Sequence, residues 1–116
     1  EYYFVSYQNE IIGNLRIIWD EPLANFPQKK LVKLHRIYLH SKVQGLGVGS
    51  SLLTWIENKA KKKQYEFFWL DTMDEKPQAF NFYKRKGFQY HSHCFLEYAL
   101  LYDSVRKMSQ VVKKLQ

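Results

Sequence analysis

The stretch Gln44-Gly45-Leu46-Gly47-Val48-Gly49 decides how the rest of the chain is interpreted. Its three glycines stand at every second position, directly before a segment in which Leu52, Leu53, Ile56 and Ala60 recur at helical spacing. The start of a helix leaves several backbone N–H groups free, and glycines let a ligand approach the backbone closely. The pattern therefore predicts a phosphate or pyrophosphate site at the start of a helix.

Two other phosphate loops fit the same stretch less well. A P-loop ends in Gly-Lys-Ser/Thr, whereas Gly49 is followed by Ser50 and Ser51. A Rossmann fingerprint has the spacing G-x-G-x-x-G, follows the first strand and has an acidic residue about twenty positions later. Here the spacing differs and three strand-like segments come first, although Asp71 could mimic the acidic residue.

Around the glycines the sequence predicts alternating strands and helices. Within residues 31–39 the apolar positions shift from even to odd numbers, which predicts a β-bulge near Arg36. Between Leu101 and Leu115 the apolar residues recur at helical spacing, but alternation over residues 108–113 also permits a strand. The expected strands span residues 2–7, 11–19, 31–39, 65–71 and 88–96, and the expected helices span residues 50–63 and 77–86.

The composition limits the class of protein. With 116 residues the chain has the size of one domain, and 46% hydrophobic residues are too many for a disordered chain. Cys94 is the only cysteine, so we expect no disulfide within the chain and a reducing, cytoplasmic compartment. No apolar run approaches the roughly 18 residues that a membrane span needs, and no membrane partner is expected. Because the chain begins at Glu1 inside a strand-like run, we expect that a segment precedes it.

Charge and histidine content do not name a function. The net charge of +7 favours anionic partners, but four lysines lie at the end of the first predicted helix, where cations complement the negative helix end. His91 and His93 share one strand face, yet further ligands are missing nearby in the sequence. We therefore expect no metal and do not expect nucleic acid as a partner.

Two motifs together resemble the GNAT acetyltransferase superfamily. The segments Leu34–Leu39 and Gln44–Gly49 resemble its central strand and its acyl-CoA pyrophosphate loop, and residues 79–88 (AFNFYKRKGF) resemble its second signature, A-x-x-F-Y-x-x-x-G-F. The resemblance covers essentially the whole chain. It implies a single α/β domain with a central, mostly antiparallel mixed sheet, a splayed parallel pair of strands and flanking helices. It also implies that the family's first strand and two helices precede Tyr2, and that the tail forms a strand at about Lys107–Lys114 after a loop or short turn at 100–105.

The same resemblance implies an acetyl-CoA site where the strands around Leu39 and Leu70 splay apart. Backbone groups before the loop would bind the pantetheine arm, and an N–H near Leu39 would polarise the thioester carbonyl. The glycine loop and the helix start would bind the pyrophosphate. The residues expected to contact acetyl-CoA, the co-substrate, are Ile37, Tyr38, Leu39, Gln44, Gly45, Leu46, Gly47, Val48, Gly49, Ser50 and Lys76.

The proton chemistry is assigned only in part. In relatives, the tyrosine that corresponds to Tyr83 often protonates the departing thiolate, and the alternative is a packing role beside Phe80 and Phe82. Many relatives have a glutamate just before the leucine of the central strand, where this chain has Lys33. The general base is therefore left open among His35, His40, Asp71 and a water chain.

The resemblance implies an enzyme that moves an acetyl group to a primary amine by direct attack. Arg36-Ile37-Tyr38 and Arg106-Lys107-Met108 resemble bacterial spermidine/spermine-type acetyltransferases, so the acceptor is a polyamine, another small amine or a protein amine. A homodimer is compatible with this interpretation. The alternative is an inactive module of the same family that binds acyl-CoA or nucleic acid.

Overall fold

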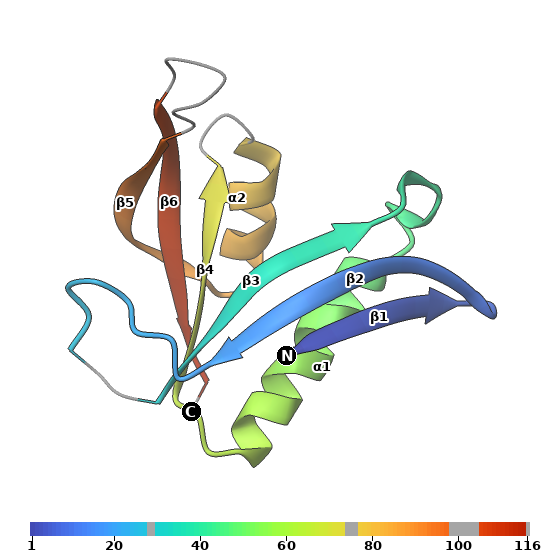
Figure 1. Cartoon of the computed structure of the whole chain (residues 1–116), viewed down its shortest axis with the longest axis horizontal. Helices are drawn as coiled ribbons and strands as arrows, with labels where there is room; N and C mark the ends of the chain where they lie inside the picture. Colours follow the sequence, from blue (N-terminus) through green and yellow to red (C-terminus); the bar gives the residue numbers. More distant parts are fainter. Residues whose placement is uncertain (28–29, 74–76, 98–104, 116) are drawn as a thin grey trace. The chain divides into compact units, whose positions relative to one another are not determined.

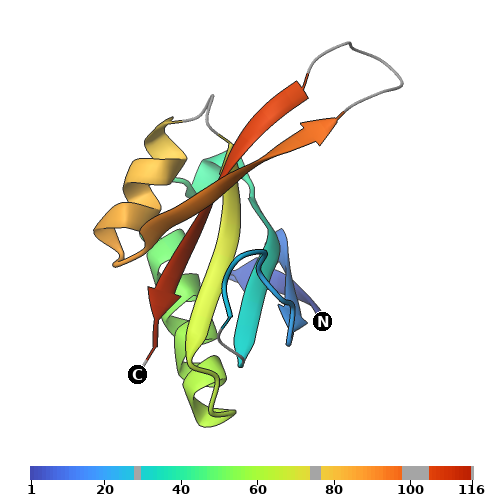
Figure 2. The same ribbon diagram turned by 90° about the vertical axis from the view of Figure 1, so that its left-hand side faces the viewer.

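The computed structural model describes residues 1–27, 30–73, 77–97 and 105–115. These residues form two compact units, and each is described by itself. The N-terminal unit comprises Glu1–Phe68 and includes Leu115 near the end of the chain, and the C-terminal unit comprises Trp69–Lys114. Figures 1 and 2 show the elements of both units in two views. The expectation of a single domain stays a prediction.

Three antiparallel strands form the sheet of the N-terminal unit. They are β1 (Tyr2–Tyr7), β2 (Glu10–Trp19) and β3 (Leu31–Leu39). The turn between β1 and β2 is closed by Gln8 and Asn9, which have φ angles of 51° and 65°. A two-residue turn with positive φ matches the twist of a hairpin, as the polar residues at these positions predict. All three strands lie within two residues of the predicted bounds.

The predicted β-bulge is present in β3. Arg16 pairs with Arg36, and the next pair joins Ile17 to Leu34, so His35 is the extra residue. This insertion explains the shift of the apolar positions from even to odd numbers. Leu34 is buried before the bulge. After the bulge, the less exposed side chains of β3 stand at odd-numbered positions, Ile37 and Leu39.

One helix covers a face of this sheet, as Figure 1 shows. The helix α1 (Val48–Lys62) follows a short 3-10 helix, η1 (Ser41–Val43), and buries Leu53, Ile56 and Ala60. These residues, together with Leu15 and Ile17 of β2, belong to the buried core of the unit. The helix begins two residues earlier than predicted because Gly47, not a residue with a capping side chain, stands at its N-cap.

In its described residues, the C-terminal unit contains one strand and one helix before the final hairpin. These are most of β4 (Phe67–Met73), whose first two residues belong to the N-terminal unit, and α2 (Pro77–Arg85). Strand β4 starts two residues later than predicted because Gln64, with a φ of 66°, is part of the turn that ends α1. Gly87, with a φ of 97°, ends α2 as predicted.

The tail is a strand, which confirms the prediction drawn from the resemblance over the helical spacing. Strand β5 (Gln89–Glu97) pairs antiparallel with β6 (Val105–Lys114), as Figure 2 shows. Of the loop predicted at 100–105, residues 100–104 lie outside the described residues, and Val105 already belongs to β6.

The strand order is that of a mixed sheet. In the N-terminal unit the order is β1-β2-β3 followed by the start of β4, and in the C-terminal unit it is β4-β6-β5. The backbone N–H groups of Glu66 and Phe67 both donate to the carbonyl of Lys30. Strands β3 and β4 therefore begin side by side and run in the same direction. The predicted α/β class and its parallel pair are confirmed.

Candidate active site

The glycine loop has a backbone that requires glycine. Gly45 and Gly47 have φ angles of 84° and 79°, in the left-handed region that other residues rarely adopt. A Cβ atom added at either position would meet no atom within 4 Å. The glycines therefore serve the conformation of the loop and leave open space beside it.

The loop also presents free hydrogen-bond donors. Val48, Gly49 and Ser50 are the first residues of α1, and Gly47 provides no capping side chain. Among the described residues, their backbone N–H groups and those of Gly45 and Gly47 have no hydrogen-bond acceptor. The first turn of α1 contains no acidic residue, so the positive end of the helix is not neutralised. Open space, free donors and a positive helix end fit a pyrophosphate group.

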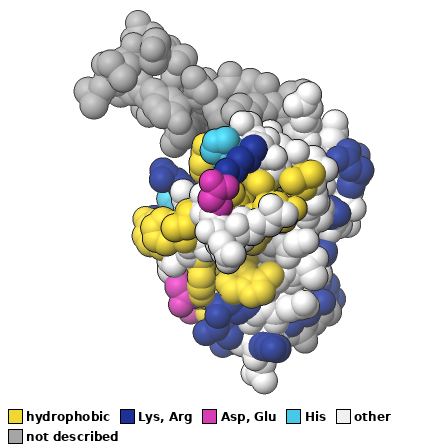
Figure 3. Space-filling model, turned by 90° about the vertical axis from the view of Figure 1, so that its right-hand side faces the viewer, with side chains coloured by type: hydrophobic (Ala, Val, Ile, Leu, Met, Phe, Trp, Pro, Cys, Tyr) yellow, Lys and Arg dark blue, Asp and Glu magenta, His cyan; other side chains and the backbone are white. Residues whose placement is uncertain are grey.

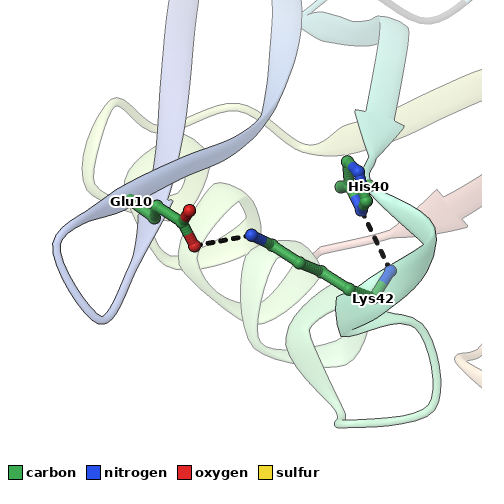
Figure 4. Close-up of polar contacts among 3 residues, drawn as sticks. All are labelled: Glu10, His40 and Lys42. Atoms are coloured by element: carbon green, nitrogen blue, oxygen red, sulfur yellow. Dashed lines mark hydrogen bonds and ion pairs between the residues drawn. The ribbon is translucent and has the colours of Figure 1, made fainter.

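The segment that enters the loop is held by several hydrogen bonds. The N–H of His40 donates to the carbonyl of Ile12 at 2.7 Å, and the Nδ1 atom of His40 accepts from the N–H of Lys42 at 3.1 Å. The side chain of Gln44 donates to the carbonyl of Leu39 at 3.4 Å. Nζ of Lys42 lies 2.5 Å from a carboxylate oxygen of Glu10, the first residue of β2. Figure 4 shows the two side chains meeting.

The predicted thioester-binding residues occupy the end of β3. Ile37, Tyr38 and Leu39 pair with the segment Gly13–Leu15 of β2 and come directly before the loop. At Gly13 the strands approach so closely that an added Cβ would lie 2.2 Å from the carbonyl oxygen of Tyr38. The structure thus brings residues 37–39 and 44–50 together in one segment of the N-terminal unit.

Tyr83 lies on α2 in the C-terminal unit. Its ring packs edge-on against Phe82, at 5.2 Å between ring centroids, and against Phe88, at 5.6 Å. Burial raises the pKa of its hydroxyl, so the phenol keeps its proton at neutral pH. The packing role is observed, with Phe88 as an additional partner, and the acid role stays a prediction. Lys76 lies outside the described residues.

The candidates for the general base differ in what their side chains already bind. His35 has its Nδ1 atom 3.4 Å from the guanidinium of Arg16, which can only donate, and His40 uses Nδ1 to accept from Lys42. A ring that accepts at Nδ1 has its proton on Nε2, so neither histidine offers a second acceptor nitrogen. Asp71 lies on β4 in the C-terminal unit and remains a candidate.

A cavity of about 510 Å³ adjoins the loop within the N-terminal unit. It lies between β1 and the first half of α1, and Figure 3 shows hydrophobic side chains gathered on this side of the molecule. It shares Leu46, Gly47 and Val48 with the loop, and its aromatic walls include Tyr3 and Trp55, whose rings meet edge-on at 5.1 Å. The spacing of apolar residues did not predict it, because its walls come from segments about forty residues apart.

Neither a metal centre nor a membrane helix is visible in the described part of the chain. Within residues 1–27, 30–73, 77–97 and 105–115, no three His, Cys, Asp or Glu residues cluster as ligands would. No helix in the same ranges combines the length and the apolar character that crossing a bilayer requires.

Comparison with known proteins connects this geometry to a family. Residues 1–88 match the model of the Acetyltransferase (GNAT) family. An uncharacterized N-acetyltransferase in the pepI 3' region of Lactobacillus delbrueckii subsp. lactis is 26% identical over 96 residues, which cover 82% of this chain and 56% of that protein. The chain thus spans little more than half the length of this curated relative.

Solved structures share the fold. A GNAT family acetyltransferase from Elizabethkingia anophelis with acetyl-CoA bound has a TM-score of 0.78 and 21% identity, over 97% of this chain and 74% of that one. A Bacillus subtilis acetyltransferase in complex with CoA has a TM-score of 0.80 and 19% identity, over 99% and 76%. With the family model matching three quarters of its residues, the chain belongs to the GNAT acetyltransferase family.

Proposed function

We propose that this chain transfers the acetyl group of acetyl-CoA to a primary amine. The observation that carries the proposal is the glycine loop, whose open side and free N–H groups suit the pyrophosphate of CoA. In the reaction the amine nitrogen attacks the acetyl carbonyl, so a C–N bond forms and the C–S bond breaks. The amine gives up one proton, and the CoA sulfur gains one. No covalent intermediate with the enzyme is needed.

The division of roles follows the order of the residues along the chain. Residues Gln44–Ser50 bind the pyrophosphate through backbone N–H groups, and Ile37–Leu39 bind the pantetheine arm and the thioester carbonyl through the backbone of β3. Lys76 supplies a positive charge for a CoA phosphate. Support for the first two roles comes from their placement in one continuous segment of the N-terminal unit.

Tyr83 acts as the general acid in this proposal. Its place in the second signature supports this role; burial keeps the phenol protonated at neutral pH, although the raised pKa makes it a weaker acid than an exposed tyrosine. The edge-on contacts with Phe82 and Phe88 fix the direction of its ring. A packed ring loses little freedom when it donates a proton, which favours catalysis.

The acceptor is a polyamine or another small amine, or an amine of a protein. Arg36-Ile37-Tyr38 supports the polyamine class by its resemblance, whereas the net charge of +7 opposes attraction of a polycation unless other parts of the protein change that charge. The lone Cys94 supports action in the reducing cytoplasm. Light scattering after size-exclusion chromatography distinguishes a monomer from a homodimer.

A binding module without turnover is the alternative function. Lys33 on β3 favours it, since a lysine at this position cannot take the role of the glutamate that many relatives have there. Such a module would bind acetyl-CoA and release no thiol. A nucleic-acid-binding version would show an affinity that falls steeply as salt is added.

One experiment separates these functions. The purified chain is mixed with acetyl-CoA and a panel that contains spermidine, a simple alkylamine and a peptide with a free N-terminus, and free thiol is measured. Binding of acetyl-CoA is measured in parallel by calorimetry. Thiol release that depends on one amine supports the enzyme, and binding without release by any amine supports the module. Absence of acetyl-CoA binding would contradict the enzyme and the acyl-CoA-binding module, and only the nucleic-acid-binding version would then be left to test by its salt dependence.

A further inference from the structure

Three side chains around the entrance of the glycine loop form one connected group. His40 follows β3, Lys42 lies in η1, and Glu10 belongs to the first hairpin (Figure 4). His40 and Lys42 are neighbours in the sequence, whereas Glu10 lies 32 positions before Lys42. The group therefore joins the tip of the first hairpin to the segment that leads into the loop.

The ring of His40 caps η1. Its Nδ1 atom accepts from the N–H of Lys42, and its own carbonyl accepts from the N–H of Val43 at 3.1 Å. The N–H of His40 donates to Ile12, which extends the pairing of β2 with β3 by one residue. His40 is thus attached to the sheet by its backbone and to η1 by its ring.

The contact between Lys42 and Glu10 adds a second attachment. Lys42 and Glu10 are 46% and 67% exposed, so their ion pair contributes little by itself. The hydrogen bond from Lys42 and its positive charge lower the pKa of Glu10, which keeps the carboxylate ionised. Lys42 is therefore held twice, because its backbone N–H donates to the ring of His40 and its side chain contacts Glu10.

The position of η1 is transmitted to the loop by backbone hydrogen bonds. The N–H of Gln44 donates to Ser41 at 3.2 Å, and the N–H of Leu46 donates to Val43 at 3.3 Å. Val43 is 2% exposed and anchors this turn in the core. Any rotation of η1 would therefore change the direction of the N–H groups at Gly45 and Gly47.

We propose that His40 is a positioning residue for the glycine loop, because its ring caps η1 and so sets the direction of the donors that bind the CoA pyrophosphate. The inference rests on the proposed function for its ligand, but the cap itself exists without ligand. His40 touches no reacting atom. Its effect is on the affinity for acetyl-CoA and not on the rate of acetyl transfer once the substrate is bound.

Two variants test the cap. His40→Ala removes the acceptor, whereas His40→Asn keeps an oxygen that can accept from the N–H of Lys42, as asparagine does at helix starts. Hydrogen exchange of the Lys42 amide is followed by NMR in the ligand-free chain, and acetyl-CoA affinity is measured by calorimetry. Circular dichroism checks that each variant is folded.

In the alanine variant we expect faster exchange at Lys42 and an affinity about fivefold weaker, the size of a typical lost cap. Its rate at saturating acetyl-CoA should stay unchanged, so that KM rises and kcat does not. In the asparagine variant both properties should return to within about twofold of the parent.

Other outcomes overturn the proposal. Equal loss in the alanine and asparagine variants would show that the ring matters for a reason other than its acceptor. Faster exchange at Lys42 with unchanged affinity would show that the cap does not position the loop. If the unaltered chain bound no acetyl-CoA, the proposed function and the ligand part of the inference would both fail. Exchange at Lys42 would then still decide whether His40 is a cap.

Discussion

Arg16 of β2 faces Arg36 of β3 directly across the sheet, at the β-bulge formed by His35. Like charges at directly opposite positions are unfavourable in a sheet. The guanidinium of Arg16 is 5.1 Å from the ring centre of Tyr2 and 3.4 Å from Nδ1 of His35. The extra residue thus provides Arg16 with a ring nitrogen as a partner. It also shifts the alternation of buried and exposed side chains for Ile37–Leu39.

Substitution of Gly47 should weaken acetyl-CoA binding in a graded way. Gly47→Ala imposes the left-handed φ of 79° on a residue with a Cβ atom, and Gly47→Val adds bulk on the open side of the loop. We expect the valine variant to bind acetyl-CoA at least tenfold more weakly, about 1.4 kcal/mol, as measured by calorimetry.

The control for this series is Gly87→Ala, which places a Cβ at another left-handed position, φ 97°, outside the loop. It should lose stability without losing affinity. A folded Gly47→Val variant with the affinity of the parent would remove the loop from the binding site.

Tyr83→Phe tests the acid role. The substitution keeps the ring that packs against Phe82 and Phe88 and removes only the hydroxyl. We expect kcat to fall about 10²–10⁴-fold, the usual range for general-acid assistance, with little change in acetyl-CoA affinity. Steady-state kinetics with an active amine provides the measurement. A rate within about twofold of the parent would leave Tyr83 with a packing role only.

Alkaline pH should destabilise the chain partly through Tyr83. Burial raises the pKa of this phenol above its value in the unfolded chain. The stability that it contributes is therefore fully present below the unfolded value of about 10 and is lost as the pH rises through the folded value. Thermal melts between about pH 8 and pH 11 should show a steeper loss for the parent than for Tyr83→Phe. Parallel curves for the two proteins would argue against this linkage.

Gly13→Ala should destabilise the N-terminal unit. The added Cβ would lie 2.2 Å from the carbonyl oxygen of Tyr38, and no side-chain rotation can relieve a clash with backbone. We expect a loss of about 1–3 kcal/mol, typical of overpacking, in urea denaturation. Asn14→Ala, at the next position of β2, is the matched control and should cost less. A variant as stable as the parent would show that β2 and β3 separate easily at this point.

Local patterns in the sequence predicted much of the fold. The shift of apolar positions in residues 31–39 located the bulge, and Pro77 and Gly87 bounded α2 within one residue. These features depend on the preferences of residues that are close in the sequence, so the local sequence is enough to predict them. The tail is the exception, because the spacing of its apolar residues favoured a helix, whereas the structure has a strand. Pairing with β5 selects the strand for β6, and only the resemblance to a family indicated that partner.

The sequence by itself determined the glycine loop, because positive φ angles and free N–H groups follow from glycines placed at the start of a helix. It left the surroundings of the loop undetermined. That Lys42 meets Glu10 and that the N–H of His40 donates to Ile12 were decided by the tertiary structure, which brings the first hairpin to the end of β3. The cap of η1 by the His40 ring is instead a local contact between residues two positions apart. Contacts between residues thirty positions apart have no periodic signal in a sequence, since they depend on where the sheet places the two segments.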